Sequence, residues 1–128
     1  MKVMTAKPGF DTNLSKLRVV AAGDGKCVAE MTVDEDHQNR GGTLHGGLTA
    51  TLVDVVSTLA LMTTDRGTPG VSVDMNVSYI AAAKLGEDIV IDADTLKVGK
   101  TLAFLKVSIS NKENGKVVAT GSHTKYIG

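Results

Sequence analysis

Residues 39–56, NRGGTLHGGLTATLVDVV, hold the side chains whose types and spacing could do chemistry. His45, Gly46 and Gly47 stand where a loop gives way to a helix-like pattern, and Asp54 follows among valines. The free amides of a helix start form a ready oxyanion site, and glycine lets a substrate carbonyl approach them. A buried carboxylate is costly unless it is paired or has a chemical role. The segment therefore predicts an oxyanion site at the helix start and a functional carboxylate further along the helix.

Structural roles are the alternative for these residues. Asp54 could be satisfied by Ser57, Thr58 or a backbone group, and His45 could be a helix-start residue without a chemical role. Spacing alone does not separate the two interpretations, but the oxyanion geometry of the helix start favours the functional one. On that basis four residues are candidates for the site: Asn39, His45, Gly46 and Asp54.

The distance between two of these residues constrains the assembly. A helix rises about 1.5 Å per residue, so Gly46 and Asp54 are separated by about 12 Å along its axis. Two groups so far apart cannot act on one carbonyl within a single chain. If both are catalytic, two antiparallel copies of the helix must pass each other, as they would in a two-fold dimer. The small residues on the face of Asp54 would permit that close approach.

Two glycine-containing segments are similar to catalytic motifs but depart from them. Gly99-Lys100-Thr101 matches the end of a phosphate-binding loop, but Asp94 stands in the place of its first glycine and a strand-like pattern follows. His45-Gly46-Gly47 is similar to the oxyanion loop of lipases, but the chain lacks their G-x-S-x-G segment. These departures exclude a P-loop nucleotide hydrolase and a serine hydrolase. Lys100 is left as an exposed hairpin lysine that could still contact a phosphate.

The histidines and the cysteine do not indicate a metal site. His37, His45 and His123 have none of the spacings of zinc motifs such as H-E-x-x-H. Cys27 is the single cysteine, which allows neither an intramolecular disulfide nor a thiolate metal site and fits a reducing compartment. We interpret His37 and His123 as surface or strand histidines, and we predict no metal.

The elements that position these residues follow from hydrophobic patterning. Residues 46–62 have helical periodicity, with an apolar stripe on one side and small residues, Asp54 among them, on the other. Alternating or β-rich runs predict strands, and turn signals such as Asn114-Gly115 separate them. The expected strands are residues 17–22, 26–33, 71–79, 89–96, 102–109 and 116–126. This order predicts an α+β domain in which a mostly antiparallel sheet wraps one long helix.

Length and composition limit the number of domains and the kinds of partner that the chain can have. A chain of 128 residues is long enough for one domain with a hydrophobic core, and small enough that a cleft could need a second subunit. Its 14 basic and 14 acidic residues cancel, so no net field attracts a nucleic acid or an anionic membrane. No apolar run approaches bilayer length, and the first residues lack the apolar core of a secretory signal. We predict one domain, no nucleic-acid partner, no membrane insertion, and a location in the cytoplasm, with the mitochondrion as a further location.

Several segments together resemble a known family. They are Asn39 followed by TLHGGLTATLVD at residues 43–54, GVSVDMN at 70–76, AKLGEDIV at 83–90 and GKTLAF at 99–104. These segments resemble hotdog-fold acyl-CoA thioesterases of the thioesterase superfamily member 2 type, and the resemblance runs from about residue 17 to the end of the chain. Against this family the N-terminus looks short, and residues 1–13 are expected to be a poorly ordered or shortened segment.

The resemblance implies a fold, an assembly and an activity. The fold is a hotdog, a curved antiparallel sheet of about six strands wrapped around one long central helix. The assembly is a homodimer or a homotetramer, with a lipid-transfer protein as a further partner. The activity is hydrolysis of medium- to long-chain fatty acyl-CoA, without metal or cofactor. A hotdog dehydratase or hydratase and a non-catalytic acyl-CoA binding protein remain alternatives, and thiol release separates both from a thioesterase.

By matching positions, the resemblance also implies a role for each site residue. Asp54 would activate the attacking water, and Ser72 would help to orient it. Gly46 would supply the oxyanion amide, while Asn39 and His45 would position and polarise the thioester. Whether Asp54 acts as a general base or attacks the carbonyl itself to form an anhydride stays open. The implied CoA contacts are Tyr79, Lys84, Lys97, Gly99, Lys100 and Thr101.

Overall fold

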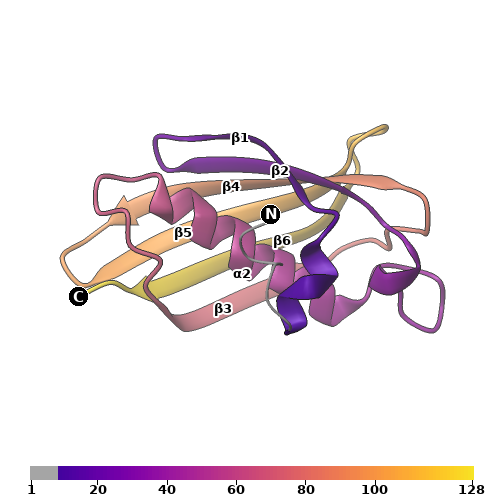
Figure 1. Cartoon of the computed structure of the whole chain (residues 1–128), viewed down its shortest axis with the longest axis horizontal. Helices are drawn as coiled ribbons and strands as arrows, with labels where there is room; N and C mark the ends of the chain where they lie inside the picture. Colours follow the sequence, from indigo (N-terminus) through magenta and orange to yellow (C-terminus); the bar gives the residue numbers. More distant parts are fainter. Residues whose placement is uncertain (1–8) are drawn as a thin grey trace.

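A long helix lies against one face of a curved antiparallel sheet (Figure 1). The computed structural model describes residues 9–128. Within them the helix α2 spans Gly46–Met62, and two short 3₁₀ helices are η1 (Phe10–Leu14) and η2 (Glu35–His37). The strands are β1 (Arg18–Gly23), β2 (Lys26–Thr32), β3 (Val71–Tyr79), β4 (Asp88–Val98), β5 (Leu102–Asn111) and β6 (Val117–Tyr126). Their order across the sheet is β1-β2-β4-β5-β6-β3, and every neighbouring pair is antiparallel.

The core lies between α2 and the central strands. Side chains alternate along β4 and β5, so that Ile89, Ile91 and Ile109 are fully buried while their neighbours in sequence are more exposed. From the helix, Leu52 and Val56 are fully buried against this layer. Burial of an aliphatic side chain of this size stabilises the fold by about 1.5–3 kcal/mol. The packing therefore fixes the helix, and with it Gly46 and Asp54, relative to the sheet.

Strand β3 forms an open edge of the sheet. It pairs with β6 along one side, and its other side has no strand partner within residues 9–128. Val71 and Val73 are 68% and 55% exposed on this strand. A long, exposed edge with apolar side chains is a template for pairing with another chain. The fold thus leaves room for a second copy next to the strand that carries Ser72.

The predicted architecture is confirmed, and the predicted helix and strands agree with the observed ones to within two residues at each end. The turn at Asn114-Gly115 joins β5 to β6, and Gly115 has a φ of +74°, which glycine adopts without strain. The prediction for residues 1–13 lies largely outside the described residues; from Phe10 the chain forms η1, whose Leu14 is fully buried. No helix in the described part of the chain is long and apolar enough to cross a membrane.

Candidate active site

Helix α2 begins with His45 as its N-cap. The imidazole Nδ1 accepts a hydrogen bond from the Gly47 amide at 2.9 Å and so satisfies one of the amides that a helix start leaves without a partner. The prediction of a free amide at Gly47 is therefore wrong, because the histidine folds back onto it. The amide of Gly46 makes no hydrogen bond to any group within residues 9–128. Since Nδ1 is an acceptor, a neutral His45 carries its proton on Nε2, where it can be donated to a ligand.

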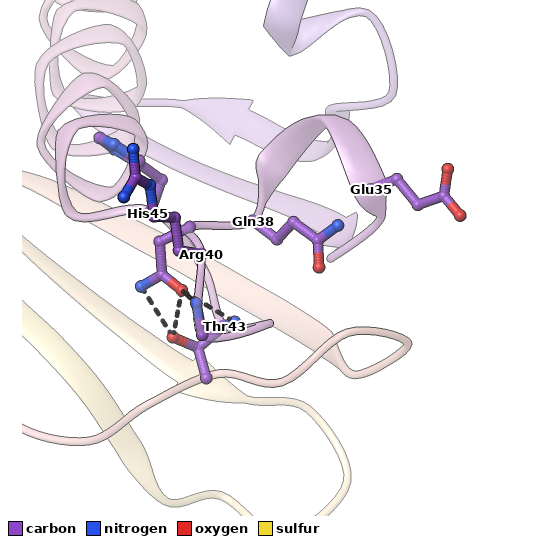
Figure 2. A pocket seen from close by; sticks show the side chains of 7 residues that line it. Glu35, Gln38, Arg40, Thr43 and His45 are labelled. Atoms are coloured by element: carbon purple, nitrogen blue, oxygen red, sulfur yellow. Dashed lines mark hydrogen bonds between the residues drawn. The ribbon is translucent and has the colours of Figure 1, made fainter.

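The loop before the helix is organised by Asn39. Its Oδ1 accepts hydrogen bonds from the amides of Gly41 and Thr43 at 2.9 and 3.2 Å, and its Nδ2 donates to the Thr43 hydroxyl at 2.9 Å (Figure 2). Such bonds to the following backbone are the usual way in which asparagine fixes a turn. The loop and the helix start together line an open pocket, formed by Glu35, Gln38, Asn39, Arg40, Gly41, Thr43 and His45 (Figure 2).

Two of the residues implied in CoA binding lie close to this helix start. Tyr79, at the end of β3, donates its hydroxyl to the carbonyl of Gly46 at 3.0 Å, and its side chain is otherwise exposed. Lys84 is exposed and lies opposite Thr43 in an isolated antiparallel bridge. The fold thus gathers one half of the predicted site at the N-terminal end of α2: Asn39, His45, Gly46, Tyr79 and Lys84.

Asp54 lies in the middle of the same helix, and its carboxylate is more accessible than the sequence predicts. Its side chain is 48% exposed, so the expected burial is wrong for the single chain: Oδ1 lies 3.9 Å from the buried His123 of β6, which covers the carboxylate only in part. Ser57 and Thr58 donate their hydroxyls to the main-chain carbonyl of Asp54, at 3.1 and 2.7 Å, and not to its carboxylate. The carboxylate itself is therefore left available for a water or a substrate.

His123 of β6 connects this part of the helix to Ser72 of β3. Its Nδ1 lies 2.8 Å from the Ser57 hydroxyl, and its Nε2 lies 2.7 Å from the Ser72 hydroxyl. Ser57 donates its proton to the Asp54 carbonyl, which can only accept, so Nδ1–H of His123 donates to Ser57 and Nε2 accepts from Ser72. In this arrangement the Ser72 hydroxyl donates its hydrogen bond to His123, and the lone pairs of Ser72 remain free to accept a hydrogen bond from a water molecule.

The charge state of His123 agrees with this arrangement. Burial lowers the pKa of His123 from its ordinary value of 6.5, and Lys125 lowers it further, while Asp54 and Asp74 act in the opposite direction. The imidazole is fully buried, with only 1% of the residue exposed, so its neutral form is favoured. Asp54 Oδ1 lies 3.9 Å from Nε2, and with a neutral ring this approach is not an ion pair.

The remaining residues implied in CoA binding lie elsewhere. Lys97, Gly99, Lys100 and Thr101 belong to the end of β4 and its turn to β5. Arg66, four residues beyond the end of α2, donates from Nη1 to the carbonyls of Gly99 and Lys100 at 3.4 and 3.2 Å. This turn is therefore at the C-terminal end of the helix, and 17 residues of helix place it about 25 Å from Gly46. Within one chain the predicted CoA contacts form two separate groups.

The interpretation of His37 and His123 as surface or strand histidines is confirmed for His123, which lies in β6, and is wrong for His37, which ends η2. Both side chains are buried, with 2% of His37 and 1% of His123 exposed. His37 Nδ1 accepts from the Asp34 amide and its Nε2 lies 3.1 Å from the Asn13 carbonyl, which links η2 to η1 and indicates a structural role. The signal for His123 was the two-residue period of β6, which puts polar side chains on the face toward α2. Within residues 9–128, no group of three or more His, Cys, Asp or Glu side chains could hold a metal ion.

Comparison with known proteins places these features in a family. The family model described as Thioesterase superfamily matches residues 41–118. Acyl-coenzyme A thioesterase 13 of Mus musculus is 59% identical over 128 residues, which are 100% of this chain and 91% of the mouse protein. The crystal structure of zebrafish thioesterase superfamily member 2 is 60% identical with a TM-score of 0.97, covering 99% of this chain and 92% of that one. A hypothetical thioesterase of Streptococcus pneumoniae TIGR4, crystallised with coenzyme A, is 26% identical with a TM-score of 0.86, covering 91% of this chain and 89% of that one.

These matches confirm the resemblance to hotdog-fold acyl-CoA thioesterases of the thioesterase superfamily member 2 type. They also confirm the prediction that the protein is an enzyme of the thioesterase class. The family match includes all of α2, and thus both Gly46 and Asp54. The chain belongs to the thioesterase superfamily.

Proposed function

We propose that the protein hydrolyses medium- to long-chain fatty acyl-CoA thioesters to a fatty acid and CoA, at a site shared between two copies of the chain. The observation that carries this proposal is that Asp54 and Ser72 both lie next to His123 Nε2, with Asp54 Oδ1 at 3.9 Å and the Ser72 hydroxyl at 2.7 Å. A half-exposed carboxylate and a hydroxyl whose proton is already hydrogen-bonded to His123 would both offer acceptors to one water molecule. The names of the mouse relative and of the CoA-bound pneumococcal structure support acyl-CoA as the substrate class.

The proposed mechanism uses water and side chains of the protein, without metal or cofactor. Asp54 takes a proton from the water as its oxygen attacks the thioester carbonyl, and Ser72 accepts a hydrogen bond from the other proton. The developing oxyanion is stabilised by the amide of Gly46 and by Nε2–H of His45. Collapse of the tetrahedral intermediate breaks the carbon–sulfur bond and releases CoA. Direct attack by Asp54, followed by hydrolysis of the anhydride, is the alternative route.

A second copy of the chain brings the two halves of the site together. Gly46 and Asp54 are separated by about 12 Å along one helix, so they can act on one carbonyl only if the start of one helix meets the middle of another. The open β3 edge beside Ser72 supports such a pairing. In this antiparallel arrangement, the Lys97 to Thr101 turn of the second copy approaches the helix start of the first. Lys84 from one copy and Lys100 from the other would then hold the phosphates of one CoA, in a dimer or a dimer of dimers.

A thiol-release assay with purified protein and acyl-CoAs of graded length tests the reaction and its chain-length preference together. We expect free CoA thiol to appear, with the highest kcat/KM for medium to long chains. Absence of thiol release, together with hydration of an enoyl-CoA or with tight binding alone, would assign the site to a hydratase or to a carrier protein. Localisation of the tagged protein tests the proposed cytoplasmic or mitochondrial site of action.

The Asp54→Asn variant tests the proposed base. Asn keeps the size of the side chain but cannot take up the proton, so we expect kcat to fall by about a hundredfold or more while acyl-CoA still binds. Asp54→Ala accompanies it, since Asn can deamidate back to Asp. If both variants are folded and hydrolyse acyl-CoA within a few-fold of wild type, Asp54 is a structural carboxylate and this mechanism is wrong.

A further inference from the structure

Lys125 is a buried ammonium close to the proposed base. It lies on β6, two residues after His123, and faces α2 because its partner Ala103 on β5 is a buried inward-facing residue. Only 4% of Lys125 is exposed. No carboxylate within residues 9–128 lies close enough to form a salt bridge with it. A lysine is rarely buried without a partner, so this placement calls for a compensating interaction.

The compensating interaction is a hydrogen bond to the helix turn of Asp54. Lys125 Nζ donates to the Thr58 hydroxyl at 2.6 Å, and Thr58 in turn donates to the Asp54 carbonyl at 2.7 Å. His123 reaches the same carbonyl through Ser57. His123 and Lys125, which are alternate residues of β6, therefore hold the same turn of α2 through two hydroxyls, and that turn carries the carboxylate.

The charge of Lys125 also acts on Asp54. Burial lowers the pKa of Lys125, and the negative charge of Asp54 acts in the opposite direction. The ammonium and the carboxylate therefore attract each other across this turn of the helix. His123 on β6 and Asp74 on β3 are the other titratable groups around this cluster, and His123 is coupled to both Asp54 and Lys125.

We propose that Lys125 is a positioning residue for Asp54, whose helix turn it holds in place through its hydrogen bond to Thr58. The proposal rests on the proposed role of Asp54 as the base. Ionised carboxylate is the form that both the general-base and the anhydride route need. The contact is made to the enzyme and not to the substrate, so its loss acts on kcat more than on KM.

Titrations followed by NMR test the charge coupling without reference to activity. In Asp54→Asn, which removes the partner charge, we expect the pKa of Lys125 to fall further than in wild type. Lys125→Met, which keeps a long side chain without the charge, assigns the Lys125 resonance. Lys106→Met, which changes an exposed lysine on the outer face of β5, is the control for a general loss of charge and leaves the Lys125 titration unchanged. The measurement on Asp54→Asn needs no substitution at Lys125, so it decides the coupling even if Lys125→Met does not fold.

Kinetics then test the link to catalysis. We expect Lys125→Met to lower kcat with little change in KM, because the contact is made to the enzyme and not to the substrate. Thr58→Val, which breaks the relay, lowers kcat several-fold, whereas Thr58→Ser keeps the hydroxyl and retains wild-type turnover. A Lys125 titration that does not respond to Asp54→Asn, or unchanged turnover in Thr58→Val, would overturn the positioning role. Lack of thiol release by wild type would instead refute the proposed function, and the titrations would still decide the coupling.

Discussion

At the scale of single residues, the environment of Asp54 explains how an exposed carboxylate can be held in one place. The side chain is free, but its main-chain carbonyl accepts two side-chain hydrogen bonds, from Ser57 and Thr58. His123 and Lys125 bind the two hydroxyls from β6. The anchoring contacts therefore leave the carboxylate oxygens for chemistry while they restrict the motion of the turn that bears them.

The neutral, buried state of His123 leads to a pH dependence of stability. Because the pKa of His123 is lowered in the folded protein, the unfolded chain binds more protons once the pH falls below the ordinary value of 6.5. Folding stability is thus highest above that value and is lost as the pH decreases. We expect thermal unfolding by circular dichroism to show a smaller loss of Tm between about pH 7.5 and 5.5 in His123→Asn than in wild type. His45→Asn, at an exposed histidine, is the control, and an equal loss of Tm in His123→Asn and wild type would refute the assignment.

At the scale of elements, His45 has a structural role at the helix start and, in the proposed mechanism, a chemical role as well. His45 caps α2 through Nδ1, and this bond orients Nε2–H away from the helix backbone. The cap leaves the Gly46 amide as the donor at the positive end of the helix. The proposed mechanism therefore couples stability and catalysis at His45, and substitution can separate them.

Two substitutions of His45 separate the cap from the donor. Serine is a good N-cap but is too short to polarise a substrate, so His45→Ser is expected to keep the wild-type Tm and to lose about tenfold in kcat/KM. His45→Ala loses the cap as well, at a cost of about 1 kcal/mol, which corresponds to a decrease of about 4 °C in Tm. Thermal unfolding and thiol-release kinetics on both variants check this. Wild-type turnover in His45→Ser would show that the imidazole is a cap alone.

At the scale of the whole molecule, the proposed mechanism divides the site into two halves within one chain. The helix start would contribute Gly46 and His45, and the middle of the helix would contribute Asp54 with Ser72. In the single chain Asp54 is half exposed, and the edge of β3 has no strand partner within residues 9–128. A second copy can therefore complete both sites of a two-fold dimer at once.

Complementation between inactive variants tests this shared site. Gly46→Pro removes the amide without distorting the helix, because proline suits the first helical position and His45 already has the extended conformation that precedes proline (φ −62°, ψ 134°). When Gly46→Pro is mixed with Asp54→Ala in equal amounts, half of the dimers are heterodimers. Each heterodimer has one intact site of its two, so about a quarter of wild-type activity returns. Gly46→Ala is the control that keeps the amide, and its Cβ would lie 3.5 Å from the Tyr79 ring, an ordinary contact. Mixtures that stay inactive after subunit exchange, proven by mass spectrometry, would exclude the shared site.

The sequence by itself determined the elements and the spacing of the chemistry along the helix. Helical and two-residue periods are local properties, so α2 and the strands could be predicted to within two residues. The separation of Gly46 from Asp54 follows from helix geometry alone, and the roles of Asn39 and Ser72 came from family resemblance. None of these inferences needs the sheet to be assembled.

Only the tertiary structure decided what surrounds these residues. His123 is 66 residues from Ser57, and the register of β6 against β3, together with the packing of α2 on the sheet, brings it between Ser57 and Ser72. The same packing buries Lys125 against Thr58 and leaves Asp54 half exposed. Local patterns report which residues alternate, but strand order and register depend on how the entire core is filled. For that reason the sequence predicted the carboxylate, and the assembled fold identified the side chains that hold it.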